Sequence, residues 1–160
     1  MDKWLTNRGI SLVEVVVGTA IILLALTGII TAYNVFVRVG SATLNTIQAS
    51  LLLEEGVEAV SVMRDYGWSS NIGNLSVGTK YYLSWNGSRW IGTVTATTTG
   101  IYTRYFILQN VSRDSNDDIV ASGGTPDPGT KKLTINVAWL SVATTTSRSV
   151  STYITNLFNN

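Results

Sequence analysis

Glu14 is the ionisable residue whose position most needs an explanation. It interrupts an apolar run that extends from Ile10 to Val37, and it is the only charged residue in that run. A carboxylate in an apolar span costs roughly 2.5–3.5 kcal/mol on membrane-insertion scales, and such residues are functional candidates by default. Glu14 is therefore the first candidate functional residue of the chain.

A second group of chemically active side chains is the segment 114–118, which reads Asp-Ser-Asn-Asp-Asp. Asp114, Asn116 and Asp118 match the one-three-five spacing of oxygen ligands in a calcium-binding loop. The pattern then departs from that loop, because Ile119 stands where glycine is required and Thr125 where a bidentate glutamate is required. A plain turn with solvated carboxylates is the favoured interpretation, and a calcium site at these three residues is the alternative.

The residue types that the chain lacks exclude several kinds of chemistry. The 160 residues include no cysteine and no histidine. Cysteine nucleophiles, Cys/His zinc sites and acid–base catalysis by histidine are therefore excluded. There is no glycine-rich phosphate loop and no Gly-x-Ser-x-Gly elbow, and the carboxylates beyond residue 67 all fall in predicted loops. We expect neither an enzymatic function nor a bound cofactor.

The apolar run around Glu14 is long enough to cross a membrane as a helix. Residues 15–37 carry no charge, and about 20 apolar residues in a helix span a bilayer. Lys3 and Arg8 precede the run, so the positive-inside bias places the N-terminus in the cytoplasm. A secretory signal would have a shorter apolar region followed by a small-residue cleavage site. A plain single-pass anchor fits the length but does not explain Glu14.

The residues around Glu14 also carry a family resemblance. Arg8-Gly9 followed by Ile10-Ser11-Leu12-Val13-Glu14 resembles the class III signal of type IV pilins and pseudopilins. The resemblance implies that a prepilin peptidase cuts between Gly9 and Ile10 and methylates the new N-terminus. Glu14 then becomes the fifth residue of the mature chain, where the family places its glutamate. The chain departs from the family at Ile10, where phenylalanine is usual.

Cleavage would give Glu14 a partner. The new amino group at Ile10 can meet the Glu14 carboxylate of a neighbouring subunit, and pairing in a low dielectric offsets much of the cost of burying that carboxylate. We therefore expect a structural filament subunit. The resemblance implies storage in the bacterial inner membrane, with lipid, an assembly platform and other pilins as partners, and an extracellular or periplasmic filament after assembly. The alternative is a single-pass anchored extracellular binding domain that does not polymerise. The cations are scattered, so the sequence does not support nucleic acid as a partner.

Small residues recur along the apolar run at Gly18, Gly28 and Ala32. Gly28 and Ala32 form a small-xxx-small pair, which allows two helices to approach closely. Glycine and alanine are also common in membrane helices that make no such contact, so both interpretations stay open.

The chain divides into four predicted segments. Residues 1–9 form the leader, 10–37 the transmembrane and polymerisation helix, 38–66 an amphipathic stalk helix, and 67–160 a β-rich head. In the stalk, Leu53 and Val57 lie on a face that should pack on the head. Glu54, Glu55 and Glu58 lie opposite, and should face either solvent or a cation such as Arg38 or Arg64 of a neighbouring subunit.

The head should contain one antiparallel sheet of four or five strands packed on the stalk helix, so the predicted fold class is α+β. A hairpin is expected from residues 81–85 and 88–91 around a type I′ turn at Asn86-Gly87. Further strands are expected near 101–111, 131–141 and 148–158. Residues 122–129 should form an exposed, turn-rich loop. The pilin resemblance implies the same architecture.

Overall fold

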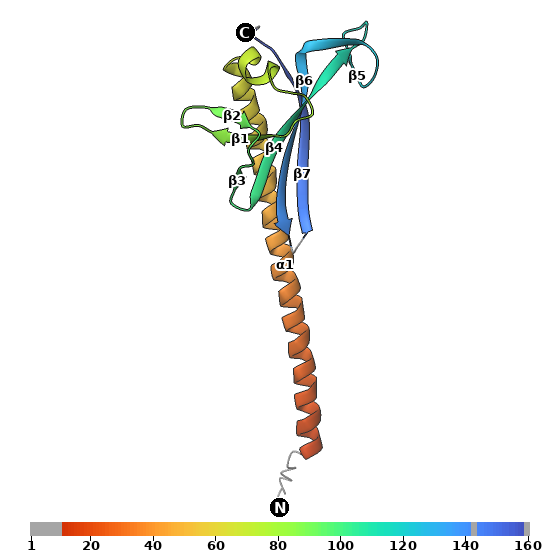
Figure 1. Ribbon diagram of the computed structural model, residues 1–160. Helices are drawn as coiled ribbons and strands as arrows, with labels where there is room; N and C mark the ends of the chain where they lie inside the picture. Colours follow the sequence, from red (N-terminus) through yellow and green to blue (C-terminus); the bar gives the residue numbers. More distant parts are fainter. Residues whose placement is uncertain (1–10, 142–143, 159–160) are drawn as a thin grey trace, which may run out of the picture. The chain divides into compact units, whose positions relative to one another are not determined.

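The computed structural model describes residues 11–141 and 144–158. One long helix is followed by a short π-helix and seven strands (Figure 1). The elements are α1 (Leu12–Asp65), η1 (Ser69–Gly73), β1 (Tyr81–Trp85), β2 (Trp90–Thr93), β3 (Thr98–Thr99), β4 (Tyr102–Arg113), β5 (Ile119–Val120), β6 (Thr125–Ser141) and β7 (Thr144–Thr155).

Helix α1 confirms the predicted long N-terminal helix, and it continues without interruption through Gly40-Ser41. The chain forms two compact units, one up to Leu44 and one from Asn45 onward. The first unit consists, within the described residues, of α1 alone, and nearly all of its side chains are exposed. The second unit holds the rest of α1 together with the sheet.

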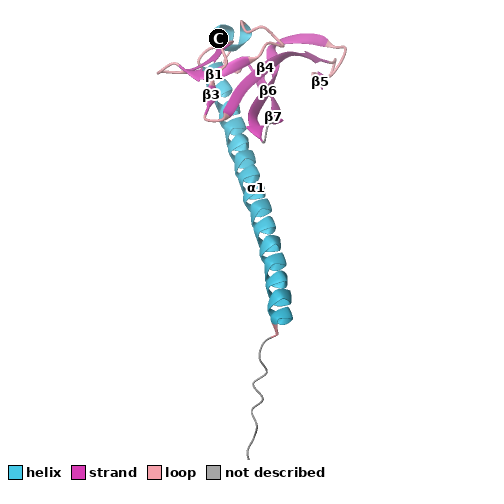
Figure 2. Ribbon diagram, turned by 60° about the horizontal axis from the view of Figure 1, so that its bottom comes forward, coloured by secondary structure: helices cyan, strands magenta, loops and turns pink. Residues whose placement is uncertain are grey.

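The strands form one antiparallel sheet in the order β2-β1-β4-β6-β7, with the short strands β3 and β5 each paired to β4. Figure 2 shows the sheet in magenta and α1 in cyan. The fold is therefore α+β, with a long apolar N-terminal helix packed against an antiparallel sheet of five main strands, which confirms the predicted fold class.

Alternation along β4 and β6 explains which sheet face meets the helix. Successive strand residues point to opposite faces, and in β6 Leu133, Ile135 and Val137 are fully buried while their neighbours are only partly covered. They form one core with buried residues of β4 and α1, among them Phe106 and Val60. This core holds the C-terminal part of α1 on the sheet by removing apolar surface from water.

Gly56 lies where the helix approaches the sheet most tightly. A Cβ atom added there would lie 2.8 Å from Cγ2 of Ile135 and 3.4 Å from Cδ of Arg104. Real Cβ contacts are longer than the first of these distances, so a larger residue would have to push the helix away from β6. The glycine therefore permits the close packing of α1 on β4 and β6.

The hairpin exists, but the predicted type I′ turn is wrong. Trp85 pairs with Trp90, so four residues connect β1 and β2 rather than two. Gly87 has a positive φ of 97°, whereas Asn86 has none. The Asn86 side chain instead accepts hydrogen bonds from the backbone N–H groups of Ser88 and Arg89, at 3.1 and 2.9 Å. A side-chain-stabilised loop has thus replaced the two-residue turn.

Strand β6 is longer than predicted and includes much of the expected loop. It begins at Thr125, and Thr125, Pro126 and Asp127 pair with the end of β4 beyond a register shift at Asn110/Val111. The shift acts as a bulge that absorbs extra residues and allows pairing to resume. The two prolines do not prevent this, because proline is tolerated near bulges and strand starts. Strand β7 likewise begins at Thr144 rather than near residue 148.

Candidate functional site

The N-terminal unit presents a bare apolar helix surface. Large apolar side chains are exposed along its whole length, with Leu24 at 73% and Phe36 at 76%. The hydroxyl groups of Thr19, Thr27 and Thr31 donate to carbonyl oxygens of the same helix at 2.8–3.0 Å. Internal satisfaction of polar groups is what a helix in lipid requires. Helix α1 is long and apolar enough to cross a membrane.

Glu14 lies in the first turn of α1 and is exposed. A carboxylate in a first turn interacts favourably with the helix dipole. Among the described residues it makes no ion pair and no side-chain hydrogen bond. Gly9 and Ile10, the predicted cleavage residues, lie outside the described residues. The described part of one chain therefore supplies no partner for the Glu14 carboxylate.

Gly18, Gly28 and Ala32 lie on α1 within the first unit. A Cβ atom added to either glycine would meet nothing within 4 Å, and Ala32 is exposed. Packing within one chain therefore gives no reason for these small residues. Their predicted role in helix–helix contact stays a prediction.

The three glutamates of the stalk do not form one surface, which corrects the predicted acidic face. Glu55 turns toward the sheet, where Oε2 lies 3.0 Å from Nη1 of Arg104. Glu54 and Glu58 are exposed and make no ion pair within the described residues. The sequence spacing placed the three glutamates within one arc of the helix, but it could not show that Arg104 of β4 would lie next to Glu55.

Arg104 is a buried charged side chain that the sequence analysis did not single out. It points inward from β4 and is only 5% exposed. Its Nη1 donates to the Leu52 carbonyl oxygen of α1 at 3.1 Å, and its guanidinium carbon lies 5.4 Å from the centre of the Trp90 ring. A buried arginine needs such partners to be tolerated. The inward register of residue 104 between Tyr102 and Phe106 was the signal that could have identified it.

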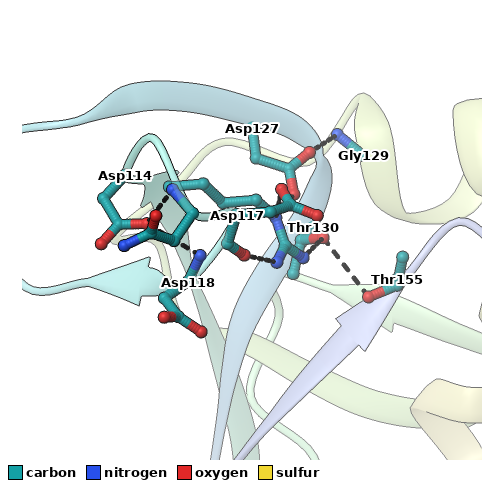
Figure 3. Close-up of polar contacts among 9 residues, drawn as sticks. Asp114, Asp117, Asp118, Asp127, Gly129, Thr130 and Thr155 are labelled. Atoms are coloured by element: carbon teal, nitrogen blue, oxygen red, sulfur yellow. Dashed lines mark hydrogen bonds and ion pairs between the residues drawn. The ribbon is translucent and has the colours of Figure 1, made fainter.

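The calcium candidate forms a turn in which one carboxylate is already engaged (Figure 3). Oδ1 of Asp114 accepts the backbone N–H groups of Asn116 and Asp118, at 2.9 and 3.0 Å. Asp117 has a positive φ of 69°, which suits a tight turn. Within the part of the chain that the structure describes, no group of three or more acidic side chains is arranged to hold a metal ion. The turn gives the Asp114 carboxylate a structural role that needs no metal ion, and the calcium site stays a prediction.

Arg113 fastens this turn to β6. Its Nε lies 2.7 Å from Oδ2 of Asp127, and its Nη1 donates to the Asp117 carbonyl oxygen at 2.7 Å. Thr130, which is buried, accepts from Nη2 at 3.3 Å and lies 3.3 Å from the Thr155 hydroxyl (Figure 3). The hydrogen bond from Arg113, helped by one from Thr130, lowers the pKa of the Asp127 carboxyl below its ordinary value. The cluster is structural, and it ties β4, β6 and β7 together.

We expect Asp127→Asn to reduce the pH dependence of stability. Because the folded pKa of Asp127 lies below the unfolded value, its stabilisation is full above about pH 4 and is lost as pH falls through the folded pKa. The variant should be about 1–2 kcal/mol less stable at pH 7. Urea unfolding of the detergent-solubilised chain at pH 7 and pH 3 measures this.

Asp117→Asn is the matched control for that experiment. The Asp117 side chain is 86% exposed and its ion pair with Arg113 is longer, at 3.6 Å, so its removal should change little. Equal pH profiles for wild-type protein and Asp127→Asn would contradict the assignment.

Comparison with known protein families, with curated proteins and with solved structures found no match to this chain. A long apolar N-terminal helix packed on an antiparallel sheet is a pilin-like α+β architecture.

Proposed function

We propose that the chain is a structural subunit of a bacterial type IV pilus-like filament, a pilin or pseudopilin. It is stored in the inner membrane with its N-terminus in the cytoplasm and is assembled through α1. The observation that carries the proposal is the exposed apolar surface of α1 with one carboxylate, Glu14, in its first turn that makes no ion pair among the described residues. A lipid bilayer covers the apolar surface but leaves the carboxylate without a partner.

Assembly supplies that partner. After cleavage between Gly9 and Ile10, the amino group of Ile10 in one subunit pairs with Glu14 of its neighbour, in a low dielectric where the attraction is strong. The exposed apolar side chains of α1 then pack against one another rather than against lipid. Gly18 and Gly28, where an added Cβ atom would meet nothing within 4 Å among the described residues, and the exposed Ala32 allow the helices to approach closely.

The alternative is a membrane-anchored extracellular domain that does not polymerise. It is consistent with α1 and with the sheet, but it leaves Glu14 without a role. The proposal assigns no catalytic activity and no nucleic-acid partner to the chain. Its other partners are the prepilin peptidase and the membrane assembly platform.

The mature N-terminus tests the proposal directly. We expect mass spectrometry of the protein from its native host to show a chain that begins at Ile10 with one added methyl group. Gly9→Val should abolish cleavage and leave a chain that begins at Met1, because the peptidase reads the residue before the cut. Gly18→Ala, which changes a glycine inside the helix, should be cleaved normally. A wild-type chain that begins at Met1 would favour the plain anchor.

A further inference from the structure

An open groove runs beside the C-terminal part of α1, and we call it the acidic groove. It has a volume of about 460 Å³ and is lined by Ser50, Leu53, Glu54, Val57, Glu58 and Val150. The five helix residues follow at i, i+3, i+4, i+7 and i+8, which is one face of a helix. Val150 belongs to β7, which lies at one end of the strand order of the sheet. The groove is therefore a helix face bounded by a sheet edge.

The groove combines an apolar floor with uncompensated negative charge. Glu54 and Glu58 are one helical turn apart, and like charges at this spacing repel each other. No ion pair within the described chain relieves that repulsion. An occupant that carries apolar side chains and one cation would satisfy both features.

Helix α1 itself carries such a segment. Its basic residues beyond the leader are Arg38 and Arg64, and Arg64 already pairs with Asp65 at 2.8 Å. Arg38 is exposed and makes no ion pair within the described residues. Val35, Arg38, Val39 and Ala42 follow at i, i+3, i+4 and i+7, so they share one helix face. Val35 and Val39 are 44% and 57% exposed.

We propose that the acidic groove receives the segment Val35–Ala42 of α1 from a second copy of this chain, with Arg38 between Glu54 and Glu58. Residues more than about one turn apart in a single helix do not face each other, so the contact requires two copies. Val35 and Val39 pack on Leu53 and Val57, while the arginine neutralises the paired carboxylates. Complementary charges contribute more to the register of such an interface than to its binding affinity.

The inference rests on the proposed function and agrees with its geometry. In the proposed filament, residue 10 of one copy lies beside residue 14 of its neighbour. In the acidic groove, residue 38 of one copy lies beside residues 54–58 of another. Both contacts need parallel helices offset in the same direction, by 4 residues in the first contact and by 16–20 residues in the second, so they join one subunit to two different neighbours. The two contacts are therefore compatible in one polymer.

Charge reversal tests the groove. Arg38→Glu should reduce the yield of sheared filaments about tenfold or more, because three carboxylates then face one another. The double change Glu54→Arg with Glu58→Arg should reduce it similarly, and the combination of all three changes should restore assembly. Arg89→Glu, which reverses an exposed cation in the loop between β1 and β2, at the other end of the strand order from β7, should leave the yield unchanged. Subunit levels in the membrane fraction are measured for every variant, so that loss of insertion is recognised.

Cysteine cross-linking tests the register independently, since the native chain contains no cysteine. Filaments with Arg38→Cys and Glu54→Cys, or with Arg38→Cys and Glu58→Cys, should form covalent multimers when treated with a short bismaleimide, which alkylates both thiols and spans the length of an Arg–Glu pair that a direct disulfide could not bridge. Filaments with Arg89→Cys and Glu54→Cys should not. If wild-type protein forms filaments but neither pair cross-links and charge reversal is not rescued, the groove assignment is wrong and the proposed function stands. If wild-type protein forms no filament, the proposed function fails, and the groove assignment fails with it.

Discussion

Glu14→Ala is expected to block filament assembly while leaving the subunit in the membrane. The change makes insertion easier, because it removes a carboxylate that costs roughly 2.5–3.5 kcal/mol in an apolar span. It also removes the proposed partner of the Ile10 amine, which then enters the filament core unpaired at a cost of several kcal/mol. We therefore expect at least a tenfold loss of sheared filaments, with unchanged subunit in the membrane fraction.

Two variants sharpen this experiment. Glu14→Gln keeps the shape and removes the charge, so it should fail as Glu14→Ala does. Thr19→Val is the matched control, because the Thr19 hydroxyl donates only to carbonyl oxygens of its own helix. A wild-type yield of filaments from the Glu14→Ala variant would contradict the proposed charge pairing. The anchored binding domain would then be the better interpretation.

Glu55→Ala is expected to destabilise the head, although Glu55 lies half exposed on the helix surface. The Arg104 side chain that it pairs with is only 6% exposed, so loss of the carboxylate leaves a buried guanidinium without its counter-charge. Exposed pairs are worth up to about 1 kcal/mol, whereas breaking a buried pair costs about 3–5 kcal/mol. The Glu55 side chain is 47% exposed, so we expect a loss of about 2 kcal/mol in urea unfolding of the solubilised chain.

Neighbouring glutamates provide the controls. Glu54→Ala and Glu58→Ala remove exposed acidic side chains that make no ion pair among the described residues, so they should change stability by about 0.5 kcal/mol or less. Adding Arg104→Met to Glu55→Ala should recover part of the loss, because an apolar chain of similar length is often as stable as a buried ion pair. Equal losses for all three glutamates would show that Arg104 does not depend on Glu55.

The local features of the fold were readable from the sequence for a physical reason. The helix ends at Asp65, two residues before Gly67, whose positive φ of 148° is a conformation that side-chain-bearing residues rarely adopt. The strand near residues 131–141 was predicted because apolar residues alternate there, and Leu133, Ile135 and Val137 of β6 are the buried members of that alternation. Both signals depend on the periods of helix and strand, which are properties of the local chain.

Features that depend on distant residues were not readable in this way. The turn at Asn86 and the start of β6 at Thr125 depend on how neighbouring strands pair and where the bulge falls. The same limit applied to charge, since only packing could bring Arg104 to Glu55. Glu55 and Arg104 are 49 residues apart in the sequence, so no local pattern predicts their contact.

By itself, the sequence determined that an apolar helix carries one carboxylate at Glu14, because composition and spacing along a single segment are sufficient for that conclusion. The tertiary structure decided what the other glutamates do. In the folded chain Glu55 pairs with Arg104, whereas Glu54 and Glu58 line the acidic groove. The reason is that helical spacing shows which residues share a face, but only packing on the sheet decides which face is covered.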